Sequence, residues 1–399
     1  MLTKKSVLLK TKFILALLLF VVSVEGIYLV SSQKLSLNSF NTTDKYIFCD
    51  KFQDLGGKQQ CWEDLIEKTL KSEDLDSAFN LLDSLYSNEP QFASDCHGFT
   101  HLLGEKAYEL FSKNQKFNVS SKASYCGFGF YHAFMESLLR TTGDLNQARR
   151  LCDDVGRQSN QNELARLSCF HGIGHGLLED IPNPTLKGGA ETITEKPLAV
   201  CVELSQSEVE IYRCASGVFN VLATYYGNPK VGLILNKDDP YLICHTQPTR
   251  SFKEACYDQM NSFILSLGQG DLSEAAKFTK SIKEDDLASA AVHGLAGAYG
   301  QNQVSKIDYD DVVKECYNLK ARLISSCLEG FLLGMIEGGK PEEEYIEAIK
   351  FCNSEYIKED EKVKCFNNIV WNVRATNPKK LLIVCSSIGQ KYQKNCNAS

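Results

Sequence analysis

The sequence predicts an all-α protein: an α-solenoid of disulfide-stapled helical hairpins behind an N-terminal signal or anchor helix. Three observations predict this fold. Sixteen cysteines occur, most of them in pairs a short distance apart along the chain. Amphipathic stretches with apolar residues at helical spacing flank these pairs, and alternating strand patterns are scarce. The second cysteines of the pairs recur about every 40 residues, which lies within the range of helical solenoid repeats.

The first 30 residues have the pattern of a membrane-inserting segment. Four lysines precede an apolar run, Phe13–Val24, which continues with one interruption to Val30. The shorter run has the length of a signal-peptide core, and the longer one approaches the ~20 residues of a membrane span. Because Val24-Glu25-Gly26 is a poor cleavage site, the sequence slightly favours an uncleaved anchor. Basic residues stay on the cytoplasmic side, so the protein is expected to face outside the cytoplasm, membrane-anchored or, if cleaved, secreted.

The rest of the chain divides into a spacer and a body. Residues 31–48 are mostly polar and predict a spacer between the membrane and the body. Residues 49–399 contain neither a second apolar span nor a Pro/Gly/Ser-rich linker, and they predict one helical-repeat ectodomain. The net charge of −7 and the expected compartment both argue against nucleic acid as a partner.

The cysteine pairs predict a disulfide framework. In nearly every pair an apolar helical pattern precedes the first cysteine and another follows the second. A bridge would therefore join the end of one helix to the start of the next, where a helical hairpin brings the Cα atoms within about 7 Å. Such bridges need an oxidising compartment, and zinc ligation by the cysteines is disfavoured because no CxxC occurs. The predicted pairs are Cys49/Cys61, Cys152/Cys169, Cys201/Cys214, Cys244/Cys256, Cys316/Cys327, Cys352/Cys365 and Cys385/Cys396.

Two further observations concern this pairing. From Tyr257 to Glu315 no cysteine occurs, so both members of one pair are missing together, as expected for bonded partners. Cys96 and Cys126 are left over and are able to bridge each other, although their separation is longer than that of the hairpin pairs.

Several predicted helices begin with a similar short pattern. DLDSAFNLLDSLY starts at Asp74, and GDLNQARRLC and GDLSEAAKFTKSI start at Gly143 and Gly270. With these GD-x-x-x-A starts and paired helices, residues 49–399 resemble tetratricopeptide-type repeat proteins, in particular the secreted cysteine-rich kind with one bridge per repeat. The usual tetratricopeptide pattern of Trp, Leu-Gly, Tyr and Pro is not met here, and the repeat is longer. The resemblance implies a binding scaffold and transfers no site residues.

One spacing recurs three times on predicted helices: a glycine, a histidine three residues later and a glutamate four after that. Residues four apart lie on one helical face, so each copy offers an imidazole and a carboxylate to the same point. Later copies that begin at Gly217 and Gly330 lack the histidine, although Glu337 persists in the second of them. The complete copies are Gly98-His101-Glu105, Gly129-His132-Glu136 and Gly172-His175-Glu179.

This frame has two interpretations. In the first it is a packing motif, in which the glycine admits a neighbouring helix and the histidine bonds a local carbonyl or its own glutamate. In the second, adjacent helices bring the imidazoles to one metal ion, for which zinc, copper or iron is the expected choice. His97 and His171 are then further ligands or supporting residues, whereas His245 and His293 lie outside the frame. The candidate metal ligands are His101, His132, His175, Glu105, Glu136, Glu179 and His171.

The sequence therefore predicts an extracytoplasmic helical-repeat scaffold that binds a protein, a glycan or another ligand, with a candidate His/Glu metal site. The alternative is a metal-dependent hydrolase or oxidoreductase, in which the same site would activate water with a glutamate as base. No HExxH, GxSxG, P-loop or dinucleotide-binding fingerprint occurs. No catalytic residue is assigned for that reason, and the balance favours a scaffold without enzymatic activity.

Overall fold

The computed structural model describes residues 49–114, 120–158, 163–179, 189–303 and 308–397. These residues are all-helical and contain no strand, as the amphipathic patterns predict. The chain divides into two compact units, Met1–Gln53 and Asp54–Ser399. The predicted anchor (residues 1–30) and spacer (31–48) lie outside the described residues. Among the helices that the structure does describe, none is long and apolar enough to cross a membrane.

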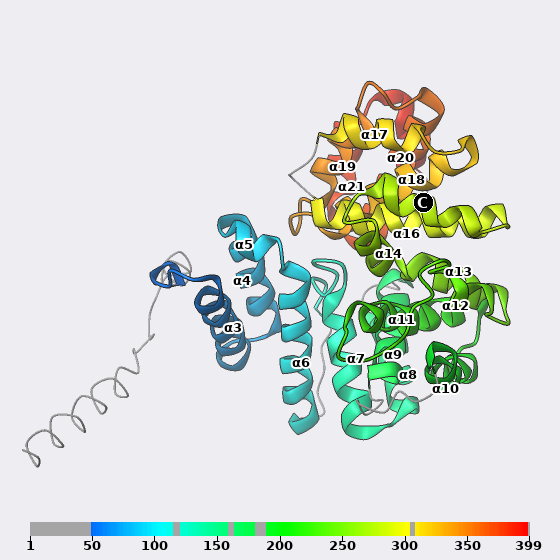
Figure 1. The fold of residues 1–399 in the computed structure, drawn as a ribbon. Coiled ribbons are helices and arrows are strands. Elements are labelled where there is room, and N and C mark those ends of the chain that lie inside the picture. The colour runs from blue at the N-terminus through cyan, green and yellow to red at the C-terminus, as the bar shows by residue number, and fades with distance from the viewer. Residues whose placement is uncertain (1–48, 115–119, 159–162, 180–188, 304–307, 398–399) are drawn as a thin grey trace, which may run out of the picture. The chain divides into compact units, whose positions relative to one another are not determined.

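The second unit is built of helices joined mainly by short connections (Figure 1). Its α-helices are α3 (Leu55–Ser72), α4 (Leu75–Asn88), α5 (Pro90–Ala93), α6 (Cys96–Asn114), α7 (Gly129–Thr142), α8 (Leu145–Gln158), α9 (Glu163–Glu179), α10 (Gly189–Leu204), α11 (Glu208–Gly227), α12 (Leu242–His245), α13 (Arg250–Gln259), α14 (Asn261–Leu267), α15 (Leu272–Ala276), α16 (Asp285–Gln303), α17 (Tyr309–Tyr317), α18 (Ile324–Glu337), α19 (Glu344–Cys352), α20 (Glu359–Thr376) and α21 (Leu381–Ser387). The 3-10 helices are η1 (Cys49–Lys51), which belongs to the first unit, and η2 (Lys277–Ser281), η3 (Ala321–Leu323), η4 (Pro378–Lys380) and η5 (Gln390–Asn397).

The aspartates at the predicted helix starts act as N-caps. The side chains of Asp74, Asp144 and Asp271 each accept a hydrogen bond from the backbone N–H three residues further on. The glycines that precede two of them, Gly143 and Gly270, have φ values of 61° and 79°, a left-handed conformation that glycine adopts without a Cβ clash. Each Gly-Asp pair therefore closes one element and begins the next.

One series of helices packs in succession along the chain. Helix α6 packs on α7, α7 on α9, α9 on α11, α11 on α13, α13 on α16 and α16 on α18. The intervening helices pack on the member that follows them, as α8 does on α9, α10 on α11 and α17 on α18. The apolar faces of the amphipathic helices are thus buried where the helices of this series pack on one another.

Disulfides hold most of these pairs of consecutive helices together, and no cysteine is free. The Cα–Cα distances across the bridges run from 5.3 to 6.0 Å. The partners are those that the sequence spacing predicts, and the two leftover cysteines are bonded to each other. The bridges are Cys96–Cys126, Cys152–Cys169, Cys201–Cys214, Cys244–Cys256, Cys316–Cys327, Cys352–Cys365 and Cys385–Cys396, while Cys49 and Cys61 are also disulfide-bonded.

The segment after α18 lies against the N-terminal helices of the second unit. The hydroxyl of Tyr86 in α4 donates a 2.7 Å hydrogen bond to the carbonyl oxygen of Gly338. The hydroxyl of Tyr125, just before α7, donates a 2.7 Å bond to Oε1 of Glu342. Residues distant in sequence are thereby brought close to the start of α6, where the candidate site begins.

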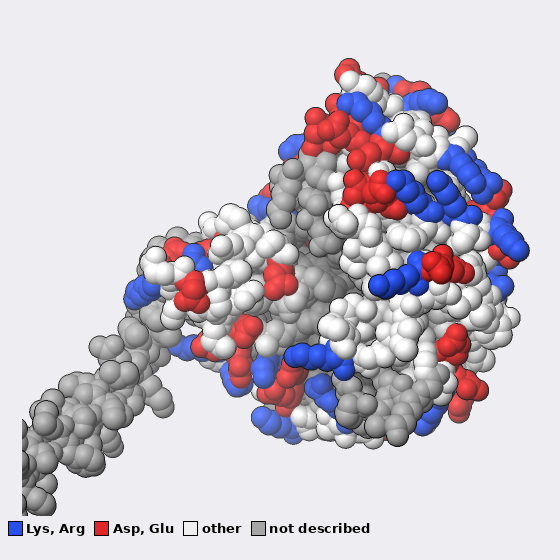
Figure 2. Space-filling model, viewed as in Figure 1, with Lys and Arg blue, Asp and Glu red and all other residues white. Residues whose placement is uncertain are grey.

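Charged side chains of both signs are interspersed on the face shown in Figure 2. Many are paired along one helix, as Lys314 is with Asp311 in α17 and Lys350 with Glu347 in α19. Such exposed pairs contribute little to stability, but a mixed and net acidic surface favours solubility.

Candidate metal centre

Five histidines from three neighbouring helices converge on one place in the second unit. Helix α6 supplies His97 and His101, α7 supplies His132, and α9 supplies His171 and His175. Within α6 and α9 the two histidines are four residues apart and therefore share a face. The ring centroid of His132 lies 5.1 Å from that of His101 and 4.6 Å from that of His175. The three histidines of the repeated frame are thus brought together, with His97 and His171 beside them.

The inner ring nitrogens of the cluster are in contact. Nε2 of His101 lies 3.1 Å from Nε2 of His97 and 3.2 Å from Nδ1 of His132. On the other side of the cluster, Nε2 of His175 lies 3.2 Å from Nε2 of His171. The nitrogens form two overlapping groups, His97/His101/His132 and His132/His171/His175, and within each group the ligand atoms are at most 4.8 Å apart.

The outer nitrogens of three of these rings meet hydrogen-bond acceptors. Nδ1 of His97 is 2.7 Å from the carbonyl oxygen of Cys126, and Nδ1 of His175 is 3.0 Å from Oε1 of Glu136. Nδ1 of His171 is 2.6 Å from Oγ of Ser216, whose own proton is donated to a backbone carbonyl. Since a carbonyl and a carboxylate only accept, Nδ1 carries a proton in His97 and His175, and the Nε2 atoms of these rings face the cluster.

Burial favours the neutral form of four imidazoles of the cluster. Desolvation lowers the pKa of His101 to about 3, and it also lowers the pKa of His97 and holds the pKa values of His132 and His171 well below the usual value. Neutral imidazole is the form that binds one metal ion, so these four rings are able to act as ligands of single ions without first losing a proton.

The frame glycines allow the three helices to approach this closely. A Cβ on Gly129 would lie 2.8 Å from the carbonyl oxygen of His97 and 2.4 Å from Oγ1 of Thr100, which would push α7 away from α6. A Cβ on Gly172 would lie 2.5 Å from the carbonyl oxygen of Tyr131, at the contact between α9 and α7. The frame glycines therefore have a packing role, and the frame histidines also converge. The two interpretations of the frame do not exclude each other.

The Cys96–Cys126 bridge holds the acceptor that orients His97. It joins the start of α6 to the loop before α7 across a Cα–Cα distance of 5.7 Å. In that loop Cys126, Gly127 and Phe128 have φ values of 52°, 72° and 62°, a left-handed run that non-glycine residues rarely adopt. This unusual backbone directs the carbonyl of Cys126 at the His97 ring.

The glutamates of the frame do not behave alike. Glu136 contacts the cluster, but its partner is His175 of the next helix and not His132 of its own. Glu105 has a side chain that is 46% exposed, with one oxygen 3.9 Å from the ammonium of Lys106. The side chain of Glu179 lies outside the described residues. The sequence predicted that the histidine and the glutamate of one copy would act together. Glu136 instead contacts the histidine of another copy, His175.

The two remaining histidines of the described chain lie in separate ion pairs. Nδ1 of His293 is 3.1 Å from Oδ1 of Asp258, and this carboxylate raises the pKa of His293 against the opposing effect of burial. Nε2 of His245 is 3.2 Å from Oδ2 of Asp239. Both are partnered outside the cluster, in line with their position outside the frame.

A cavity of about 410 Å³ opens on one side of the cluster. His97 and His101 line it together with Cys126, Gln301 and Glu337. Burial raises the pKa of Glu337 to about 7, so its carboxyl group is able to exchange a proton near neutral pH. In the sequence, Glu337 is the glutamate of a copy that lacks the histidine. Nothing in the spacing of that copy indicated that α18 would lie near the start of α6.

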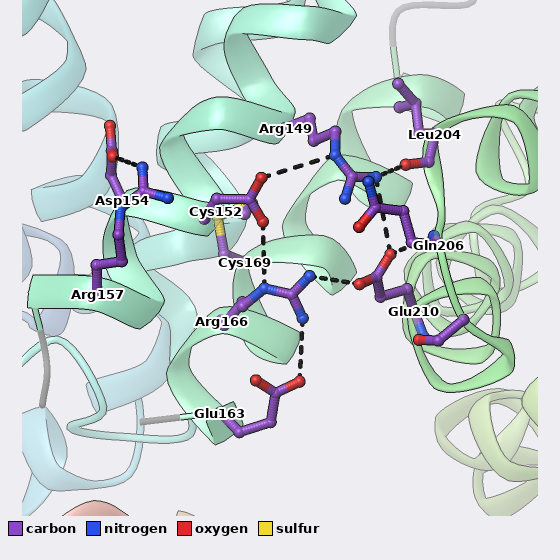
Figure 3. Close-up of polar contacts among 12 residues, drawn as sticks. Arg149, Cys152, Asp154, Arg157, Glu163, Arg166, Cys169, Leu204, Gln206 and Glu210 are labelled. Carbon is purple, nitrogen blue, oxygen red and sulfur yellow. Dashed lines mark hydrogen bonds and ion pairs between the residues drawn. A yellow bond between two sulfur atoms is a disulfide. The ribbon is translucent and has the colours of Figure 1, made fainter. Parts of the chain in front are cut away.

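A network of ion pairs fixes α8, α9 and α11 relative to one another (Figure 3). The guanidinium of Arg166 in α9 contacts Glu163 at 3.0 Å, Asp153 of α8 at 3.2 Å, and Glu210 of α11. Glu210 is 4% exposed and lies 3.7 Å from the guanidinium of Arg149. A buried carboxylate held between two guanidiniums orients the helices more than it stabilises them, and α9 and α11 carry His171, His175 and Ser216.

No family model, no curated protein and no solved structure matches this chain. The likeness to tetratricopeptide-type repeats therefore stays an expectation from the sequence.

Proposed function

We propose that this protein binds a transition-metal ion through its histidine cluster. The observation that carries this proposal is the 3.2 Å contact between Nε2 of His171 and Nε2 of His175. With the proton of each ring on Nδ1, where His175 meets Glu136 and His171 meets Ser216, two Nε2 lone pairs face each other and are able to bind one ion. A cation between them removes the repulsion. A proton between the two nitrogens is the alternative to an ion, and metal titration distinguishes the two.

The spacing of the nitrogens supports a metal ion. Two nitrogens bound to one ion at ~2.0–2.1 Å with a tetrahedral angle lie about 3.3 Å apart. The three inner contacts of the cluster measure 3.1, 3.2 and 3.2 Å. An all-imidazole set favours zinc, copper or iron over magnesium or calcium, which prefer oxygen ligands.

Metal titration tests the proposal. The full-length protein, freed of metal with a chelator, is expected to bind Co²⁺ with the visible bands of nitrogen coordination and to release it to Zn²⁺. The double variant His132→Ala, His175→Ala is expected to lose more than about 100-fold in affinity, since removing ligands costs more than removing their outer partners. The control is the double variant His245→Ala, His293→Ala, which should bind as the native protein does. Equal affinity in the native protein and in the cluster variant would refute the metal site.

We also propose that the metal site belongs to an α-solenoid scaffold outside the cytoplasm, with a protein or a glycan as its partner. The succession from α6 to α18 supports the solenoid, and the disulfides support an oxidising compartment. A metal-dependent enzyme remains the alternative, and the cavity beside His97 and His101 favours it.

The N-terminal segment is proposed to be an uncleaved anchor. Amino-terminal sequencing of the mature protein, together with membrane fractionation, is expected to find residue Met1 retained and the protein in the membrane fraction. A mature chain that begins near Ile27 and stays soluble would make the protein a secreted one.

A further inference from the structure

The cluster contains five imidazoles. A single zinc ion would use at most four of them, because zinc sites are almost always four-coordinate. The ligand nitrogens fall into two groups, and His132 is the histidine common to both. Three protein ligands with a vacant fourth position is the pattern of reactive zinc sites, and each group supplies three.

His132 lies between the two groups. Its Nδ1 is 3.2 Å from Nε2 of His101 in the first group. Its ring centroid lies 4.6 Å from that of His175 and 4.8 Å from that of His171 in the second group. An imidazolate, formed when a metal-bound imidazole releases its one N–H proton to solvent, binds one ion at each nitrogen. With metal–nitrogen bonds of ~2.0–2.1 Å, ions bridged in this way lie roughly 6 Å apart.

The two groups differ in their access to solvent. His97 and His101 line the cavity of about 410 Å³, a volume within the range of small-molecule pockets. His171 and His175 are 9% and 6% exposed, and they are not among the residues that line this cavity. An ion in the first group can therefore take a ligand from the cavity, whereas an ion in the second is shielded from it.

The charge at the cluster indicates what kind of ligand would enter. Two divalent ions bring four positive charges to a buried place, where the carboxylate of Glu136 and the imidazolate of His132 offset two of them. Because buried charge is costly unless it is balanced, an anion at the open position lowers the free energy of the loaded site.

Building on the metal-binding function above, we propose that the cluster holds two metal ions bridged by His132, and that the ion at His97 and His101 takes a small anion from the cavity.

Copper loading of the full-length protein tests this inference. After removal of excess Cu²⁺ by gel filtration, two copper ions per chain are expected. Their electron paramagnetic resonance signal should integrate to well below two spins, because the bridge couples them. Azide should then produce a charge-transfer band that saturates at one azide per chain.

Two matched double variants separate the groups. His97→Gln, His101→Gln should hold one copper with a full signal and no azide band, and His171→Gln, His175→Gln should hold one copper with a full signal and the azide band retained. Circular dichroism and a count of free thiols check that each variant is folded.

The outcomes distinguish the two proposals. A native chain that binds no copper would defeat the metal-binding function itself. One copper per native chain would leave that function standing and overturn the two-ion site. Two uncoupled copper ions would overturn the bridge. An azide band that persists without His97 and His101 would overturn the assignment of the open position.

Discussion

Replacing Gly217 with alanine is expected to destabilise the protein by about 3 kcal/mol and to abolish metal binding, because overpacking a close helix contact displaces the backbone. A Cβ at Gly217 would lie 2.0 Å from the carbonyl oxygen of His171, 2.9 Å from the nitrogen of His175 and 3.0 Å from Cα of Gly174. Helix α11 would have to move away from α9. That movement would shift both histidines of α9 and separate Ser216 from the ring of His171.

Chemical unfolding under non-reducing conditions and the Co²⁺ titration measure the two effects. The matched control is Gly227→Ala at the end of the same helix, where a Cβ would meet nothing within 4 Å. That variant should be unchanged, or more stable by up to about 1 kcal/mol through its higher helix propensity. Equal unfolding midpoints for Gly217→Ala and the native protein would contradict the proposed close contact.

Replacing Glu136 with glutamine is expected to weaken metal binding by about 10–100-fold while leaving the fold intact, as is typical when the outer partner of a metal-binding histidine is lost. The carboxylate accepts a bond from Nδ1 of His175 and thereby fixes which nitrogen of that ring faces the cluster. Glutamine preserves the size of the side chain and removes its charge. The histidine is then less basic and less strictly oriented.

The same Co²⁺ titration measures this loss, and the frame itself provides the control. Glu105 occupies the equivalent position one copy earlier, but its side chain is about half exposed and lies near Lys106. Glu105→Gln should therefore bind metal as the native protein does. An equal loss in both variants would mean that general charge, and not the bond to His175, explains the effect.

The disulfide partners could be predicted because they depend on local geometry. Helices that are consecutive in sequence lie side by side, and the short loop between them limits which cysteines can meet. Cys316 and Cys327, for example, are separated by 11 residues and join α17 to α18. For Cys96 and Cys126, separated by 30 residues, the sequence left the pairing open, since their contact depends on the left-handed backbone before α7.

The repeated glycine had a packing role that is independent of the histidines. Gly330 follows Cys327 by three residues, and its Cβ would lie 2.1 Å from the carbonyl oxygen of His293, in a copy that carries no frame histidine. Gly294, in the copy without cysteines, would similarly meet the carbonyl oxygen of Asp258 at 2.0 Å. Glycine therefore allows close helix contacts in copies with and without a frame histidine.

What the sequence by itself determined about this protein is what depends on neighbours along the chain: the helices, their caps, the cysteine pairs and the face on which each histidine lies. Only the tertiary structure decided that Glu136 serves the histidine of the next helix and that Ser216 orients His171. It also decided that Glu337 of α18 would border the cavity at the start of α6. These contacts join residues far apart in sequence, and they are set by how closely whole helices pack, which no spacing within one helix encodes.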